Sequence, residues 1–266
     1  MLANTFLKTL RDRRRGLLCW GIGLSLLAIL MAAFFPTIRD MPSLGDFMEL
    51  FPPELMALFG GNFEDYNTPE GFLNGELFGF LYPLMLLIFS VGFGAGAIAG
   101  EEQEGTLDLL LSHPLRRWQL VIEKFAALVV SLLGIAAFFW LALLAAGAVI
   151  DMGLNPLRLA AVGFSGVLLA VMFGALALAV GCARGKKTLA LGVAGALGFV
   201  SYIINGLAPL VDWLEPFRKF SPFYHYNVAD PLTNGLDYGH AAILLGLAII
   251  FLAMAIVTFR KRDLSV

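Results

Sequence analysis

Six long apolar runs constrain this sequence more than any other feature. Each run holds about 20 residues or more without a single Asp, Glu, Lys or Arg, and a helix needs about that length to cross ~30 Å of hydrocarbon. Barrel strands would instead alternate apolar and polar residues. The sequence therefore predicts an all-α polytopic membrane protein with six transmembrane helices, at Gly16–Phe35, Leu77–Ala99, Phe125–Ile150, Leu159–Ala183, Leu189–Val211 and Ala241–Phe259.

The composition excludes the common soluble classes. Of the 266 residues, 59% are hydrophobic and 14% are charged, against roughly 45–50% and 25% in an average soluble domain. Charges this sparse leave no basic surface for nucleic acid. Cys19 and Cys182 lack a CxxC spacing and the three histidines lack an HExxH spacing, so we expect no disulfide and no metal site. Residues 1–266 are predicted to form a single membrane domain.

The basic residues fall mainly on one side of the predicted membrane. Fourteen of the eighteen Lys and Arg residues lie in the two terminal tails and in the loops after spans two and four. Thirteen of the twenty acids lie in the other connecting segments. Cytoplasmic segments carry the excess of Lys and Arg. Both termini are therefore predicted to be cytoplasmic, in a multi-pass protein of the cell (plasma or inner) membrane.

Three polar segments are predicted to fold at the membrane surfaces. Residues 1–15 place apolar side chains at helical spacing beside a basic face, which predicts an amphipathic helix on the inner leaflet. Residues 36–76 carry eight acids against one Arg and are predicted to form an outer cap of short helices and turns. Residues 212–239 are rich in aromatic side chains, which favours interfacial or re-entrant helices on the outer side. Span one has full length, so we expect no cleavable signal peptide.

The inner loop at residues 100–118 is predicted to fold as a helix. Thr106 is suited to cap it, Asp108 falls in its first turn, and Pro114 ends it. Anionic lipid repels acidic side chains, which favours docking of a cytoplasmic partner over a helix that lies on the membrane. The apolar face of the helix and the acids that precede it are Leu107, Leu110, Leu111, Glu101, Glu102 and Glu104.

This loop resembles a motif of ABC type-2 transporter permeases. The run Glu101–Pro114 reads Glu-Glu-Gln-Glu-Gly-Thr-Leu-Asp-Leu-Leu-Leu-Ser-His-Pro, and the family motif reads roughly Glu-x-x-x-Gly-Thr-Leu-(Glu/Asp)-x-Leu-Leu-x-x-Pro. The run Ser221–Tyr224 is similar to the family's segment before the last span. Six spans, inner termini and a basic amphipathic start match along the whole chain. The resemblance points to the antibiotic and multidrug branch of exporters.

The resemblance implies a division of labour between subunits. In this family the permease forms the path, and a separate subunit binds ATP and magnesium and hydrolyses ATP. The working unit would hold two ATPases and a second permease chain, identical or related, with no cofactor and no catalysis on this chain. A second, smaller contact is implied at Arg184–Thr188. The implied ATPase-coupling residues are Glu101, Glu102, Glu104, Gly105, Thr106, Leu107, Asp108, Leu110, Leu111, Pro114, Arg116 and Arg117.

The residues independently favour a separate ATPase. Gly181–Thr188 comes nearest to a phosphate-binding loop, but its glycine spacing is one residue short of GxxxxGK[ST]. This run also follows directly on a predicted span. We interpret it as a basic inner loop, and we expect the chain not to be an enzyme.

Spans two and five line the central cavity in the resembling family. Polar groups at membrane depth usually face protein or a water-filled path, so hydrogen bonds between helices remain an equal alternative, as do packed or lipid-facing positions for the aromatic residues. An apolar, aromatic cavity favours export of an amphiphilic substrate such as a drug, an antibiotic or a lipid. The candidate path residues are Phe78, Tyr82, Met85, Phe89, Ser201, Tyr202 and Asn205.

Two alternatives come from other functional classes. The run Gly163–Gly166 fits the GxSG pattern of rhomboid intramembrane proteases, with Ser165 as nucleophile and His240 as its base. The residues after His240 lack the glycines of that family, and the acidic inner loop has no role in such an enzyme. A secondary transporter is the other alternative, although no span carries a charged residue at its centre for a proton or sodium relay.

Overall fold

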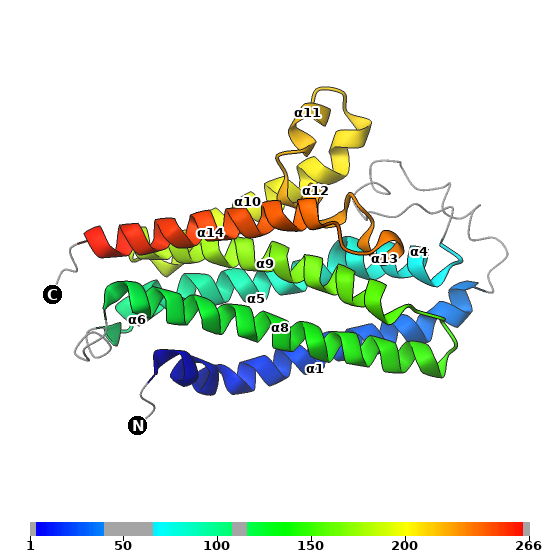
Figure 1. The fold of residues 1–266 in the computed structure, drawn as a ribbon, viewed down its shortest axis with the longest axis horizontal. Coiled ribbons are helices and arrows are strands. Elements are labelled where there is room, and N and C mark those ends of the chain that lie inside the picture. The colour runs from blue at the N-terminus through cyan, green and yellow to red at the C-terminus, as the bar shows by residue number, and fades with distance from the viewer. Residues whose placement is uncertain (1–3, 40–65, 108–115, 263–266) are drawn as a thin grey trace.

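The chain folds into a single helical bundle. The computed structural model describes residues 4–39, 66–107 and 116–262, and all regular elements in these ranges are helices. Six helical stretches are long and apolar enough to cross a membrane (Figure 1), which confirms the predicted all-α, six-span fold. The spans are α1 (Thr5–Arg39), the continuous α4, η2 and α5 (Pro69–Leu73, Asn74–Leu81, Tyr82–Ala97), α8 (Arg117–Val149), α9 (Pro156–Arg184), α10 (Lys187–Leu207) with the 3-10 turn η3 (Ala208–Leu210), and α14 (Tyr238–Lys261).

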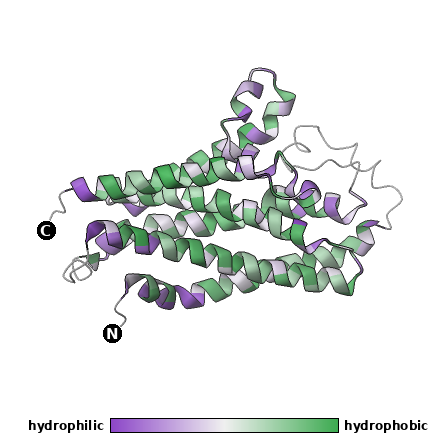
Figure 2. Ribbon diagram, in the orientation of Figure 1, coloured by the Kyte–Doolittle hydropathy of each residue, from purple (hydrophilic) through white to green (hydrophobic). Residues whose placement is uncertain are grey.

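The two ends of the bundle differ in what they carry. Both chain termini lie at one end, together with α6 (Ala99–Gln103), and we call this the termini end (Figure 1). The far end carries α4 and the start of α9. Three short helices precede the last span toward this end: α11 (Glu215–Arg218), which projects sideways from the bundle, α12 (Pro222–Asn227) and α13 (Pro231–Asn234). Apolar residues dominate the middle of the bundle, and hydrophilic residues gather toward its ends (Figure 2).

Helix α9 lies at the centre of the bundle. In its most apolar window 83% of the residues are buried, against 22% in α1 and 17% in α10. Glycines bring α9 against α5: a Cβ on Gly94 would lie 2.2 Å from the carbonyl oxygen of Gly174, and one on Gly174 would lie 2.2 Å from Ser90 Oγ. The Ser90 hydroxyl donates a hydrogen bond to the Ala170 carbonyl across this contact. Small residues at such crossings let the backbones approach closely, as is usual between membrane helices.

Several predicted boundaries are wrong because helices continue past the apolar runs. Residues 5–15 are not a separate helix but the first turns of α1, which continues without a break through Gly16 into span one. Helix α1 also extends through Pro36 into the predicted outer cap. At the other side of that cap, span two begins at Pro69 and contains the π-helical segment η2. Residues 40–65 of the cap lie outside the described residues.

Candidate functional site

The acidic inner loop is described up to Leu107 and again from Arg116. Its first four residues belong to α6, and a turn at Gly105 follows, with φ +69°. Leu107 is buried in a small apolar cluster with Ile98 and Phe259. This side chain therefore packs inward onto the bundle. Asp108, Leu110, Leu111 and Pro114, which carry most of the predicted helix, lie outside the described residues.

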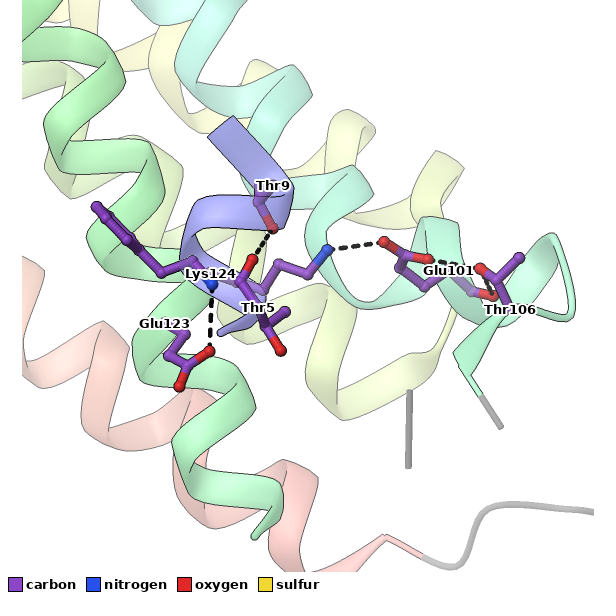
Figure 3. A network of polar contacts seen from close by, with 7 residues as sticks. Thr5, Thr9, Glu101, Thr106, Glu123 and Lys124 are labelled. Atoms are coloured by element: carbon purple, nitrogen blue, oxygen red, sulfur yellow. Dashed lines mark hydrogen bonds and ion pairs between the residues drawn. The ribbon is translucent and has the colours of Figure 1, made fainter. Parts of the chain in front are cut away.

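Glu101 joins the loop to α8 (Figure 3). Lys124 Nζ donates to Glu101 Oε1 at 2.7 Å, and the Thr106 hydroxyl donates to Glu101 Oε2 at 2.5 Å. Burial alone would raise the pKa of the Glu101 carboxyl, but the hydrogen bonds from Lys124 and Thr106 outweigh it and lower this pKa. The Lys124 side chain is only 7% exposed, so Glu101 supplies the anion that a buried ammonium requires.

Glu102 joins the loop to the C-terminal tail. Its carboxylate forms an ion pair with the guanidinium of Arg262, and Arg262 also donates to the Cys182 carbonyl at the end of α9. The Arg117 guanidinium donates in turn to the Arg262 carbonyl at 2.7 Å. Gly185, at φ +65°, leaves the space for this pair, because a Cβ there would lie 2.1 Å from Arg262 Nη2. The ends of α6, α8, α9 and α14 are therefore tied together at one point.

Helix α1 is attached to the same end of the bundle. The Phe6 amide donates to Glu123 of α8 at 3.2 Å (Figure 3). The Arg13 guanidinium lies over the Phe93 ring of α5, 4.1 Å from its centroid, which is within the range of a cation–π contact. Gly96 accommodates Arg13, since a Cβ there would lie 3.3 Å from Arg13 Nη2. We call these contacts, together with those of Glu101 and Glu102, the termini-end network.

The predicted coupling residues that the structure describes thus divide into two groups. Glu104, Gly105 and Arg116 are exposed. The others contact partners within the chain, and they are Glu101, Glu102, Thr106, Leu107 and Arg117. The sequence did not identify the partners Lys124 and Arg262. They entered only the count of basic residues that predicts which side of the membrane is cytoplasmic. No local pattern identifies them, because Arg262 lies 160 residues away from Glu102.

An apolar groove of about 470 Å³ lies between α5 and α10. One wall is a face of α5 with residues at helical spacing, the other is α10, and a residue of α12 closes one side. Almost all of the lining surface is apolar. We call this the α5–α10 groove, and its lining residues are Phe80, Leu84, Leu87, Ile88, Val91, Leu191, Gly195, Gly198, Phe199, Tyr202 and Phe223.

The predicted path residues on α10 lie in and beside this groove. Tyr202 lines it and packs edge-on against Phe223. Asn205 lies one turn further along, and its side-chain oxygen is buried without a hydrogen-bond partner among the described residues. The backbone carbonyl of Ser201 accepts a hydrogen bond from the Ser221 hydroxyl at 2.7 Å, which fastens α10 to the start of α12.

The predicted path residues of span two lie elsewhere. Phe78 and Tyr82 are fully buried on the other side of the helix, where the Tyr82 hydroxyl donates to the Gly163 carbonyl at 2.9 Å. Met85 lines a separate groove of about 300 Å³ along α1, and Phe89 packs edge-on against Trp20 of α1. The missed residues on α5 are those of the groove face. Their helical spacing was visible in the sequence, but span two is apolar all round, so the pattern does not select one face.

The geometry speaks against the protease alternative. The Ser165 hydroxyl donates to the Tyr226 carbonyl at 3.1 Å, whereas His240 Nδ1 lies 2.9 Å from His225 Nδ1. Ser165 and His240 therefore each have a different partner and form no nucleophile–base pair. The run Gly181–Thr188 comes nearest in sequence to a phosphate-binding loop. In the structure, Gly185 of this run ends α9 as a C-cap in the left-handed conformation.

Comparisons with known proteins add to this geometry. The model of the family described as "ABC-2 family transporter protein" matches residues 3–264. The chain is also similar to a Pseudomonas aeruginosa protein named "Probable ABC transporter permease protein NosY". The two sequences are 30% identical over 216 residues, which cover 70% of this chain and 77% of the relative. The family match includes the termini-end network and both walls of the α5–α10 groove.

Proposed function

Since the chain belongs to the ABC-2 transporter family and is therefore a membrane subunit of an ABC transporter, we propose that it forms the export path for an amphiphilic molecule. The observation that carries this proposal is the α5–α10 groove, which is about 470 Å³ in volume, partly open and almost entirely apolar. A cavity of that kind suits a ligand with a large apolar part and few polar groups. Asn205, whose buried side-chain oxygen has no partner in the described part of the chain, offers one polar contact near the groove.

In this proposal a separate ATPase subunit holds ATP and magnesium and docks at the termini end. The exposed Glu104, Gly105 and Arg116 would form part of its contact surface, in the position that the sequence motif implies. Two ATPases and a second permease chain complete the unit. The second copy would face the open side of the groove, where Leu197, Phe199 and Val200 of α10 are exposed.

The termini-end network supports a route from the ATPase contact to the groove. A displacement of α6 acts directly on α5, which ends at Ala97 just before α6 begins. It also acts on α8 through Glu101 and Lys124, and on α14 through Glu102 and Arg262. Because α5 forms one wall of the groove, such a movement changes the width of the path. Coupling of this kind travels through contiguous packed elements.

Filling the groove tests the proposal. Gly195 lines the groove and has open space around its missing Cβ, so Gly195→Leu should fill the path without disturbing the chain's own packing. Gly192 also has open space but does not line the groove, which makes Gly192→Leu a matched control. We expect Gly195→Leu to abolish efflux of a panel of amphiphilic dyes by the complex with its ATPase, while Gly192→Leu transports normally. Equal transport by the two variants would contradict a path through this groove.

A further inference from the structure

A second cavity, of about 590 Å³, opens at the far end of the bundle and is lined mainly by polar side chains. Its walls come from α4, η2, the first turn of α9 and the segment from α11 to α13. It shares no lining residue with the α5–α10 groove. Neither the family match nor the proposed export path accounts for a polar cavity at this place.

The cavity walls carry charges of both signs. Arg158 and Arg218 supply two cations, and Glu70 and Asp230 supply two anions. Among the described residues, neither guanidinium forms an ion pair with a carboxylate, unlike Arg262 at the other end. Arg218 is held by a cation–π contact with Tyr224, 5.5 Å from the ring centroid. Both guanidinium groups therefore line the cavity, and no carboxylate of the described residues forms an ion pair with either of them.

Two polar atoms in the wall have no partner among the described residues: Asn74 Oδ1 and Arg218 Nε. The identity of the Asn74 atom follows from chemistry, because its other amide atom lies 2.8 Å from a carboxylate oxygen of Asp230 and must be the donor. The wall therefore has one unused acceptor and one unused donor. Both atoms are buried just behind the cavity surface, where a polar group without a partner is unfavourable.

Asp230 also has an unusual backbone conformation at the cavity wall. It adopts a left-handed backbone conformation with φ 43°, which is costly for any residue with a Cβ. The conformation places its side chain against Asn74 at the cavity wall. Asp is one of the few residue types other than Gly that adopt this conformation, and here the surrounding structure holds it in place.

We propose that this cavity binds a zwitterionic group, with a phosphate or carboxylate against Arg158 and Arg218 and a protonated amine against Glu70 and Asp230. Guanidinium groups recognise such oxyanions through paired hydrogen bonds. Phosphoethanolamine has this chemistry, and it occurs both as a lipid headgroup and as a soluble molecule. The cavity is a site additional to the export path, and its occupancy does not depend on the path's substrate.

The test uses the purified full-length chain and two probes. Retention of phosphatidylethanolamine against phosphatidylglycerol is measured by native mass spectrometry, and binding of soluble O-phosphoethanolamine is measured by calorimetry. Arg158→Gln should weaken binding about tenfold or more, and it should leave the fold intact because Arg158 is exposed. Lys219→Gln is the matched control, since Lys219 is an exposed neighbour of Arg218 that does not line the cavity.

A third variant separates recognition of the amine from that of the anion. Glu70→Gln should remove the preference for phosphatidylethanolamine while retention of phosphatidylglycerol persists. Binding of the lipid alone assigns the site to a headgroup, and binding of the soluble probe assigns it to a soluble zwitterion; both support the proposal. If neither probe binds the unmodified chain more tightly than Arg158→Gln, or if Lys219→Gln has the same effect, the cavity holds water only and the proposal is wrong.

Discussion

The two ends of the bundle use charged side chains in opposite ways. At the termini end, Glu101 and Glu102 pair with Lys124 and Arg262, and these contacts tie four helices together. At the far end, Arg158 and Arg218 line an open cavity without a carboxylate partner among the described residues. Charged side chains therefore connect helices at the termini end, whereas at the far end they line a cavity that a ligand can enter.

The difference indicates at which end a charged side chain can be replaced without lowering the stability of the protein. A paired, half-buried charge leaves its partner unsatisfied when it is removed. An unpaired charge on a cavity wall has no such partner, so its removal affects ligand binding and not folding.

Glu101→Gln should have the largest effect on stability. It leaves the Lys124 ammonium, only 7% exposed, without an anion. We expect a loss of about 2–3 kcal/mol in the free energy of unfolding, measured by denaturation in a fixed detergent. Glu104→Gln is the control, because Glu104 is exposed and its loss should cost less than about 0.5 kcal/mol.

A double variant sharpens this result. If the loss arises from the unpaired ammonium, adding Lys124→Met to Glu101→Gln should recover part of the stability, because both charges are then absent. Equal losses in Glu101→Gln and Glu104→Gln would show that the ion pair does not stabilise the termini end.

The same substitution at the two ends should give a smaller contrast. Arg262→Gln removes the ion pair with Glu102 and a hydrogen bond to the Cys182 carbonyl. We expect a loss of about 1–2 kcal/mol and faster amide exchange in the last turn of α14. Arg158→Gln should cost less than about 0.5 kcal/mol. A comparable loss at both positions would mean that Arg158 has a structural partner after all.

Hydropathy predicted the fold because each of the six runs is long enough to decide its own structure. The boundaries were less accurate, since helices such as α1 and α8 continue into polar sequence beyond the apolar runs, and α1 does so through both Gly16 and Pro36. Residues 5–15 illustrate this: they have the predicted amphipathic pattern, yet they form the first turns of a 35-residue helix.

The candidate site was predicted less well, for two physical reasons. The acids of the inner loop were singled out from the sequence as a docking surface, but the partners of Glu101 and Glu102 come from distant positions that only the packing of the bundle brings together. The path residues of span two required a choice of helix face, and an apolar helix offers no polar face to guide it. Phe80 and Leu84 face the groove, while Phe78 and Tyr82 are buried inside the bundle.

The ends should also respond to pH in different ranges. Burial lowers the pKa of His225 below its usual value of 6.5, and the nearby His240 adds to this effect. Since the folded state disfavours protonation, this contribution to stability is complete above about pH 6.5 and is lost as the pH falls below it. At the termini end, the lowered pKa of Glu101 gives a contribution that is complete above 4.5 and is lost only below that value.

The smallest expected effect is therefore a fall in thermal stability between pH 7.5 and 5.5, caused by the far end alone. Nε2 of His225 donates to the Lys219 carbonyl, so Nδ1 of the neutral ring is the acceptor toward His240 Nδ1, and protonation of His225 removes this acceptor. His225→Gln should flatten the unfolding temperature across this range, whereas Glu101→Gln should leave the slope there unchanged and flatten it only below pH 4.5. An unchanged slope in His225→Gln would place the titrating group elsewhere, and the two ends would then no longer differ in their response to acid.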